Sequence, residues 1–308
     1  MNYDIPINEE LTSLALAFNN KSFIADKVLP RVPVTTESFK YLYYPKEQFL
    51  TVPDTNIGPK GEANTVDLNA EVRTASVKAR ALKDIIPIAK IDAAVKSGQK
   101  SPMDKATVQL TRLIQLDREV QTAKLLADTA NYGKSKALSG TDCINDPNSD
   151  AINIIQDMID DMLMAPTTMV MSRKVASAIR RNRSIVSGFH GNSGDKGMVP
   201  LEYLKELFGF QDIFVGESIM NSAKKGQQAQ LVGVWGNFIS MFYADATADT
   251  EGGMTFGLTA EYEKRTTRNW TVEDKGIKGC EAVQVHEQET ELITAPECGA
   301  LLYNVLKG

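Results

Sequence analysis

The residue types that usually carry catalysis are few and scattered in this chain. It has two histidines, His190 in a glycine-rich stretch and His286 in a predicted strand, and neither has the nucleophile and orienting acid of a catalytic triad beside it in the sequence. Ser193 lies in Gly-Asn-Ser-Gly, which does not match the G-x-S-x-G nucleophile elbow. The phosphate-loop, dinucleotide and H-E-x-x-H motifs are missing from the sequence. We therefore expect no enzyme, no catalytic residue, no cofactor and no metal site.

Two groups of charged residues are candidates for binding. Asp157, Asp160 and Asp161 alternate with Ile and Met in a predicted helix, which is typical of a solvated face. A basic cluster follows, and it could contact a neighbouring subunit, contact phosphate, or be plain surface; its members are Arg173, Lys174, Arg180, Arg181 and Arg183. A second basic alternation, Lys78, Arg80 and Lys83, would complement an acidic patch on an adjacent copy.

Composition sets broad limits on the function. The 308 residues are 43% hydrophobic and 24% charged, as in ordinary soluble globular proteins. A net charge of −5 argues against a general nucleic-acid binder. Cys143, Cys280 and Cys298 are too widely spaced for a zinc site or a disulfide framework, so we expect buried thiols in a reducing cytoplasm. The N-terminus does not read as a signal peptide, and the most apolar window, residues 231–244, is too short for a membrane span.

The elements that must position any functional surface begin with a segment that lacks a core. Residues 1–37 hold one short apolar run and an extended stretch with Pro30 and Pro33. Residues 38–83 predict one long, narrow β-hairpin, with a β-bulge near Arg73-Thr74 where the apolar alternation changes parity. Because an isolated two-stranded hairpin is marginal in water, we expect neighbouring copies of the chain to order this whole segment.

The rest of the chain predicts one long helix and an α/β region. Ser101 as N-cap and Pro102 at the first turn begin a helix that ends near Asp128, with Leu113 in its apolar stripe and Arg118 on its outer face. Residues 150–164 predict a further helix, and residues 187–197 a mobile loop. Gly236-Asn237 predicts a tight hairpin between strands 231–235 and 238–242. Further strands are expected at 254–262, 279–294 and 299–306.

This order of parts resembles the major capsid proteins of tailed bacteriophages, which have the Hong Kong-97-type fold. The local sequences that carry the resemblance are FIADKVLP and VPV at 23–34, FKY and YPKE at 39–47, VWGN at 234–237 and PECGALLYN at 296–304. The resemblance implies an α+β capsid fold with an extended N-arm at 1–37 and a long β-hairpin E-loop at 38–83. It also implies a P-domain at 84–148 with a long spine helix and strands from about 250–290, and an α/β A-domain with return strands at 149–308.

The implied function is a major capsid protein that self-assembles into pentamers and hexamers of an icosahedral shell around double-stranded DNA. The resemblance also implies a virion location after assembly in the host cytoplasm, non-specific DNA contact, no membrane, and separate scaffold, portal and decoration proteins. Lys60 at the hairpin tip is a crosslink candidate by its location alone. The expected inter-subunit contacts are Phe23, Val28, Val32, Val34, Tyr41, Tyr43, Lys60, Lys78, Arg80, Arg173, Arg180 and Arg181.

Two other functions stay open at this point. An encapsulin-like bacterial nanocompartment shell would share the fold but enclose cargo enzymes instead of DNA. A soluble α/β enzyme is the alternative from another class, and it is disfavoured because the sequence offers no catalytic constellation. Packaged DNA or a cargo enzyme in purified particles separates the first two functions, and a stable monomer would favour the third.

Overall fold

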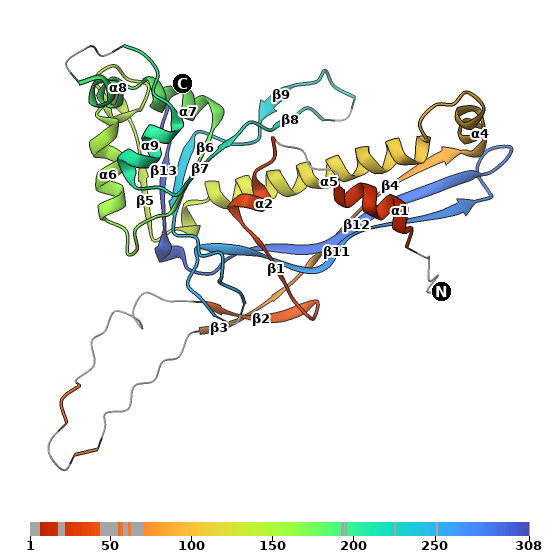
Figure 1. Cartoon of the computed structure of the whole chain (residues 1–308), viewed down its shortest axis with the longest axis horizontal. Coiled ribbons are helices and arrows are strands. Elements are labelled where there is room, and N and C mark those ends of the chain that lie inside the picture. The colour runs from red at the N-terminus through yellow and green to blue at the C-terminus, as the bar shows by residue number, and fades with distance from the viewer. Residues whose placement is uncertain are drawn as a thin grey trace.

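The computed structural model describes residues 7–17, 22–43, 55–57, 61–62, 71–191, 194, 196–224, 226–250 and 252–307. An α/β region lies at one end of an elongated molecule, and a long helix, α5, runs from it along a narrow sheet to the other end (Figure 1). Of the helices in these ranges, none combines the length and apolar character that a bilayer crossing needs.

Helix α5 spans Pro102–Ala127, which confirms the predicted long helix. The Ser101 side chain accepts a hydrogen bond from the Met103 amide, and Pro102 occupies the first turn, as the capping pattern predicts. Two details of the predicted faces are wrong. Leu113 is 52% exposed, whereas Arg118 is buried. The reason is that the buried face continues through Arg118 and Thr122, because acidic partners on the sheet beneath neutralise the arginine.

The narrow sheet has the order β1-β11-β12-β4 and lies against α5. Its strands are β1 (Arg31–Pro33), β11 (Gly257–Val272), β12 (Cys280–Ile293) and β4 (Lys78–Pro87). Strand β1 pairs with β11 in parallel, and the other pairs are antiparallel. Helix α1 (Glu9–Ala17) packs on this sheet, and α4 (Ile88–Lys96) follows β4 at the far end of the molecule. The predicted strands at 254–262 and 279–294 are thus confirmed, with β11 longer than expected.

The described residues of the N-terminal segment pack on their own chain, which corrects the expectation that neighbouring copies order the whole segment. Helix α2 (Ala25–Val28) and the residues around it pack against α5. Ile24, Val28 and Leu29 belong to one buried cluster with Leu126 of α5. A short bridge and α1 add a second attachment further upstream, where the Asn8 amide donates to the Thr267 carbonyl at 2.8 Å.

The predicted hairpin is shorter than residues 38–83 suggest. Strand β2 (Ser38–Tyr43) pairs with β3 (Glu71–Ser76) in continuous register, so the bulge predicted at Arg73-Thr74 is wrong. The interruption falls at Val77, after which the chain leaves β2 and joins β12 as β4. The change of apolar parity therefore marks a strand that moves from one sheet to another. Most of the predicted hairpin tip, Lys60 included, lies outside the described residues.

The α/β region is built on a five-stranded sheet of order β5-β13-β10-β6-β7. Its strands are β5 (Lys134–Ala137), β6 (Thr168–Ser172), β7 (Asp212–Gly216), β10 (Phe238–Phe242) and β13 (Gly299–Tyr303). The helices are α6 (Ala151–Asp160), α7 (Arg173–Arg181), α8 (Arg183–His190) and α9 (Leu201–Phe208). One-turn 3-10 helices occur at η1 (Thr129–Asn131), η2 (Gly140–Asp142) and η4 (Pro296–Cys298). Apolar side chains of β6, β10 and β13 pack with helices α6 to α9 into the largest hydrophobic core of the described residues.

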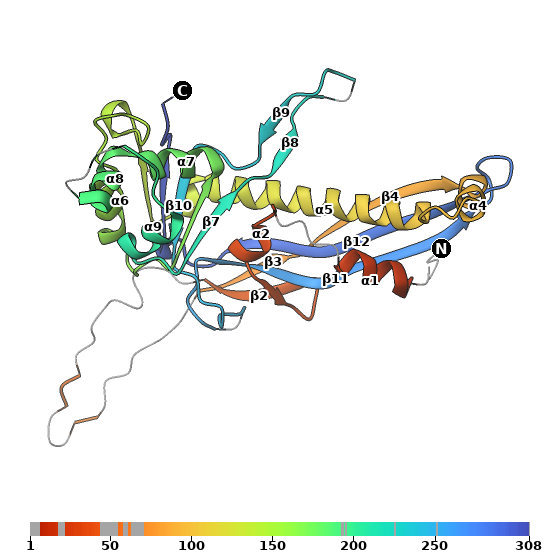
Figure 2. The ribbon, with the colours of Figure 1, turned by 45° about the horizontal axis from the view of Figure 1, so that its top comes forward.

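Two predictions for this region are wrong. The predicted hairpin at Gly236-Asn237 does not form, because β10 pairs with β13 and β6 in the middle of the sheet. The residues before it form β9 (Leu231–Gly233), which pairs with β8 (Ile219–Asn221) in a separate ribbon that projects away from the sheet (Figure 2). The predicted loop at 187–197 is helical up to His190, because α8 continues to that residue.

Candidate functional site: a buried charge network

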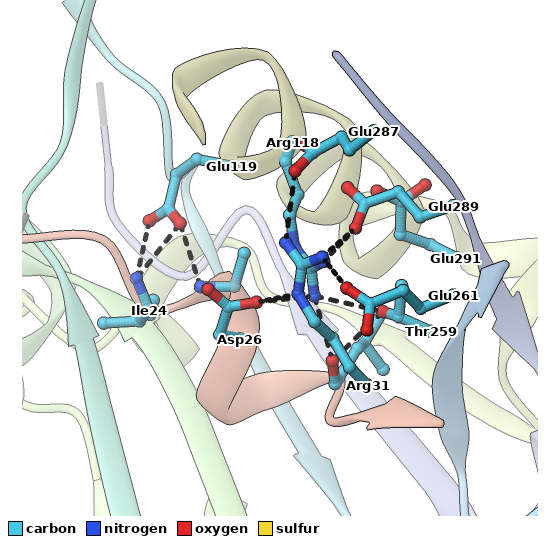
Figure 3. Close-up of polar contacts among 12 residues, drawn as sticks. Ile24, Asp26, Arg31, Arg118, Glu119, Thr259, Glu261, Glu287, Glu289 and Glu291 are labelled. Atoms are coloured by element: carbon cyan, nitrogen blue, oxygen red, sulfur yellow. Dashed lines mark hydrogen bonds and ion pairs between the residues drawn. The ribbon is translucent and has the colours of Figure 1, made fainter. Parts of the chain in front are cut away.

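A buried network of charged side chains joins the N-terminal segment to α5 and to the narrow sheet. Asp26 and Arg31 of the N-terminal segment lie beside Arg118 of α5 and the glutamates of β11 and β12 (Figure 3). Arg118 and Glu119 are adjacent on α5 but contact different segments. Arg118 contacts Glu289 of the sheet, whereas Glu119 contacts the backbone around Ile24. The three glutamates of β12 (Glu287, Glu289, Glu291) share one face because they are two residues apart in a strand.

Glu119 is fully buried and accepts hydrogen bonds from three separate segments of the chain. Its carboxylate oxygens accept from the amides of Ile24, at 3.0 Å, and Ala25, at 2.9 Å. They also accept from the Ser218 hydroxyl at 3.2 Å and from the Trp235 indole N–H at 2.7 Å. Hydrogen bonds to an ionised carboxylate are the strong ones in proteins. Glu119 thus holds the start of α2 and both ends of the β8–β9 ribbon against α5.

Arg118 is the most deeply buried cation of the described residues, with 1% of its surface exposed. Its Nη1 lies 2.6 Å from Glu289 Oε2, and its Nη2 donates to the Leu29 carbonyl and the Thr259 hydroxyl, both at 3.2 Å. Asp26 lies 3.0 Å from the same Nη2. A buried charge without such partners would cost several kcal/mol, so Arg118 requires the N-terminal segment to be in place.

Glu289 is the centre of the network, because three guanidinium groups from three elements contact it. Besides Arg118, Arg31 of β1 lies 2.8 Å from Oε2 and Arg80 of β4 lies 2.8 Å from Oε1. Arg80 also reaches Glu291 at 2.9 Å. Strands β1 and β4 are the two edges of the sheet, so this one carboxylate ties both edges to the helix above them.

The network perturbs the titration of its acids in opposite directions. Burial is the main cause that raises the pKa of Glu289 to about 7, and nearby Glu287 adds to the rise while the arginines oppose it. For Asp26 burial acts upward too, but Arg118 and Arg31 together hold its pKa below the usual value. Burial likewise acts to lower the pKa of Arg31, but Glu289 and Asp26 outweigh it and raise that pKa. Arg31 therefore stays charged, whereas Glu289 can gain a proton near neutrality.

The predicted contact residues are not brought together in one place. Val28 and Tyr41 are buried inside their own chain, so neither forms the surface contact that we expected. Arg80, expected to meet an adjacent copy, pairs with glutamates of its own β12. Half-buried residues of the set are Phe23, Val32, Val34, Tyr43 and Arg180. Lys78, Arg173 and Arg181 are exposed, and Lys60 lies outside the described residues.

Sequence reasoning missed Arg118, Glu119, Arg31 and the β12 glutamates. One signal was present, because Glu287, Glu289 and Glu291 alternate with Gln288 and Thr290 along a predicted strand. Three acids on one face of a strand predict basic partners opposite them. Within the described ranges, no three His, Cys, Asp or Glu side chains are grouped to hold a metal ion. The arrangement fastens segments together.

Comparisons with known proteins agree along the whole chain, although no family model matches it. The major capsid protein of Pseudomonas phage JBD67 is 40% identical over 307 residues, which is 99% of each chain. The major capsid protein of a Burkholderia phage, BcepMu, is 25% identical over 252 residues, or 77% of this chain and 76% of that protein. The crystal structure of a phage-related protein from Bordetella bronchiseptica RB50 has the same fold, with a TM-score of 0.75, 20% identity and 98% of both chains covered. The chain therefore belongs to the bacteriophage major capsid proteins, which are structural, non-enzymatic subunits of the virion shell with an α+β fold.

Proposed function

We propose that this capsid subunit assembles as pentamers and hexamers of an icosahedral shell that encloses double-stranded DNA. In this proposal α5 is the spine helix and the β2–β3 hairpin begins the E-loop. Residues 1–37 are the N-arm and residues 38–83 the E-loop. Residues 84–148, with strands from about 250–290, form the P-domain, and residues 149–308 form the A-domain with its return strands. Contact with DNA is non-specific, and because the net charge of −5 disfavours general nucleic-acid binding, it is confined to one face of the subunit.

The observation that carries the proposal is the fastening of the N-terminal segment across α5 by Glu119, Arg118 and Glu289. In this proposal the N-arm and the E-loop of each subunit bind neighbouring copies, so their attachment to the subunit body must withstand the resulting forces. A buried ionic network gives up its partners only at high cost, so it suits a segment that carries load. The β2–β3 hairpin extends from this anchored base, and its Val72 is 57% exposed.

In a closed ring of subunits, individually weak contacts are sufficient for stable assembly. Each copy meets the next through the same pair of surfaces, and the ring closes after five or six copies. Once one contact has formed, the others act at high effective concentration. We propose that Phe23, Val32, Val34 and Tyr43 contribute apolar contacts to neighbouring copies. The exposed Lys78 and Arg181 contribute charged contacts at the margins, where single ion pairs add little.

The relatives favour a viral shell over a nanocompartment, because both are named major capsid proteins. We propose in addition that scaffold, portal and decoration proteins are separate chains and that assembly takes place in the host cytoplasm. The test is to purify particles from infected or producing cells and to analyse their contents. Nuclease-protected double-stranded DNA is the expected result, and particles that hold a cargo enzyme in place of DNA would contradict the viral function.

A further inference from the structure

Helices α6 and α7 each carry, at one end, charges that oppose the helix dipole: α6 at its C-terminal end and α7 at its N-terminal end. The last turn of α6 carries Asp157 and Asp160, with Asp161 as C-cap and no basic residue. Helix α7 begins with Arg173 and Lys174 and has no acidic residue in its first turn. A helix C-terminus is the negative end and an N-terminus the positive end, so both arrangements destabilise the helix that carries them. Such a local conflict is expected where function constrains the surface.

These two helix ends lie at opposite edges of the five-stranded sheet. Asp157 and Asp161 line a surface hollow together with β5, which is one edge strand. Arg173 and Lys174 line a cavity of about 380 Å³ beside Gly216, the last residue of β7, which is the other edge strand. Figures 1 and 2 show α6 on the far side of the α/β region from α7 and the β8–β9 ribbon.

The cavity at the start of α7 combines positive charge with apolar surface. Besides Arg173 and Lys174 it is lined by Ile219, Trp235 and Leu306. Ile219 is 59% exposed even though it lies in a strand. Glu217 also lines the cavity, but from Ser218 to Trp235 the sequence has no acidic residue.

The hollow beside α6 is lined by two aspartates and two lysines, so the negative charge that a partner could meet lies on the exposed side of α6 itself. Lys134 and Lys136 of β5 line the hollow, and Lys134 lies 3.9 Å from Asp161. Asp157 and Asp160 lie on the exposed side of α6, where Gln156 donates to Asp160 at 2.8 Å. Ile159 and Met162 beside this helix end pack against the core of their own chain, so the exposed aspartates are what the helix end offers to a basic cavity.

We propose that the C-terminal end of α6 of one copy docks into the cavity between α7 and the β8–β9 ribbon of the next copy. Arg173 and Lys174 then face Asp157 and Asp160 across the contact. Because the two surfaces differ and lie at opposite sheet edges, the contact is heterologous and repeats around a ring. This inference rests on the proposed shell function and identifies the basic cluster at the start of α7 as a subunit contact.

Charge reversal tests the contact with its own control. Arg173→Glu with Lys174→Glu, and separately Asp157→Lys with Asp160→Lys, should each reduce the fraction of protein in shells at least tenfold. The four changes together should restore assembly, because the charges again match. The Arg173→Glu, Lys174→Glu variant should melt at or above the wild-type temperature as an unassembled subunit, since it relieves the unfavourable start of α7.

Sedimentation and thermal unfolding of the unassembled subunits separate the outcomes. Either reversal that assembles like wild type would overturn the contact, and so would a four-residue variant that melts normally and stays unassembled. If wild-type chain forms no shells under any condition, the proposed function fails instead, so the two failures are distinguishable.

Discussion

Replacing Glu119 by Gln tests whether one buried carboxylate fastens the N-terminal segment. The substitution keeps the size of the side chain and removes its charge. Glutamine has one acceptor oxygen and one NH2 group, while the site holds the amides of Ile24 and Ala25 at one oxygen and the Trp235 indole at the other. Whichever way the amide turns, an N–H group of the protein faces the new NH2.

The magnitude follows from these contacts. One buried donor loses its partner, and the remaining bonds lose their ionic character, so we expect a loss of about 3 to 5 kcal/mol. For a chain of 308 residues this loss lowers the melting temperature by about 5 to 8 °C, given an unfolding entropy of ~2.1 cal/mol/K per residue.

Thermal unfolding of the unassembled subunit measures the loss, and hydrogen exchange locates it. The amides of Ile24 and Ala25 should exchange faster in Glu119→Gln, and the β8–β9 ribbon should loosen with them. Asp117→Asn is the matched control, because Asp117 is on the same helix with a side chain that is 53% exposed and 3.7 Å from Arg80. It should change stability by less than about 1 kcal/mol. Equal melting temperatures for Glu119→Gln and wild type would refute the reasoning.

Three further predictions concern buried groups. Arg118→Met leaves Glu289 without one of its cations and should lower the free energy of unfolding, measured in urea, by about 3 to 5 kcal/mol. The control Arg112→Met, at an exposed position of the same helix, should lower it by less than about 0.5 kcal/mol. Similar losses for the two variants would contradict the network. Because the pKa of Glu289 is raised from 4.5 to about 7, the folded chain holds a proton there that the unfolded chain releases, so this contribution to stability is full below pH 4.5 and is lost as the pH rises through 7. The stability advantage of wild type over Glu289→Gln should therefore shrink by about 2 to 3 kcal/mol between pH 5 and 8, and a constant difference would argue against it. Burial, assisted by Glu297, raises the pKa of the Cys298 thiol to about 11, so iodoacetamide should label this residue at pH 8 only after unfolding; rapid labelling of the folded chain would show that it is accessible.

Local signals predicted the elements whose ends are fixed by neighbouring residues. The bounds of α5 follow from Ser101 and Pro102, which act within one turn of the helix start. Gly209 ends α9 in the left-handed conformation that glycine adopts without strain, with φ of 75°. Strand pairing is a long-range property, and there the local pattern failed. Gly236-Asn237 has hairpin chemistry, but β10 gains more by pairing on both sides within the sheet.

The contacts of the candidate site could not be predicted from local sequence patterns for a related reason. An amphipathic pattern assigns every charged residue to the outer face, so it predicts that Arg118 is exposed to solvent. Its partner Glu289 is 171 residues away in the chain, and nothing local connects the two. The contact that holds the N-terminal segment to its own chain is equally non-local, because Glu119 lies 94 residues beyond Ala25.

Electron microscopy of the chain produced alone, combined with mass photometry, tests the central claim that this subunit builds a shell from copies of itself. We expect closed shells, or sheets and tubes made of five- and six-membered rings. A uniform population of monomers that forms no rings at any concentration would contradict self-assembly.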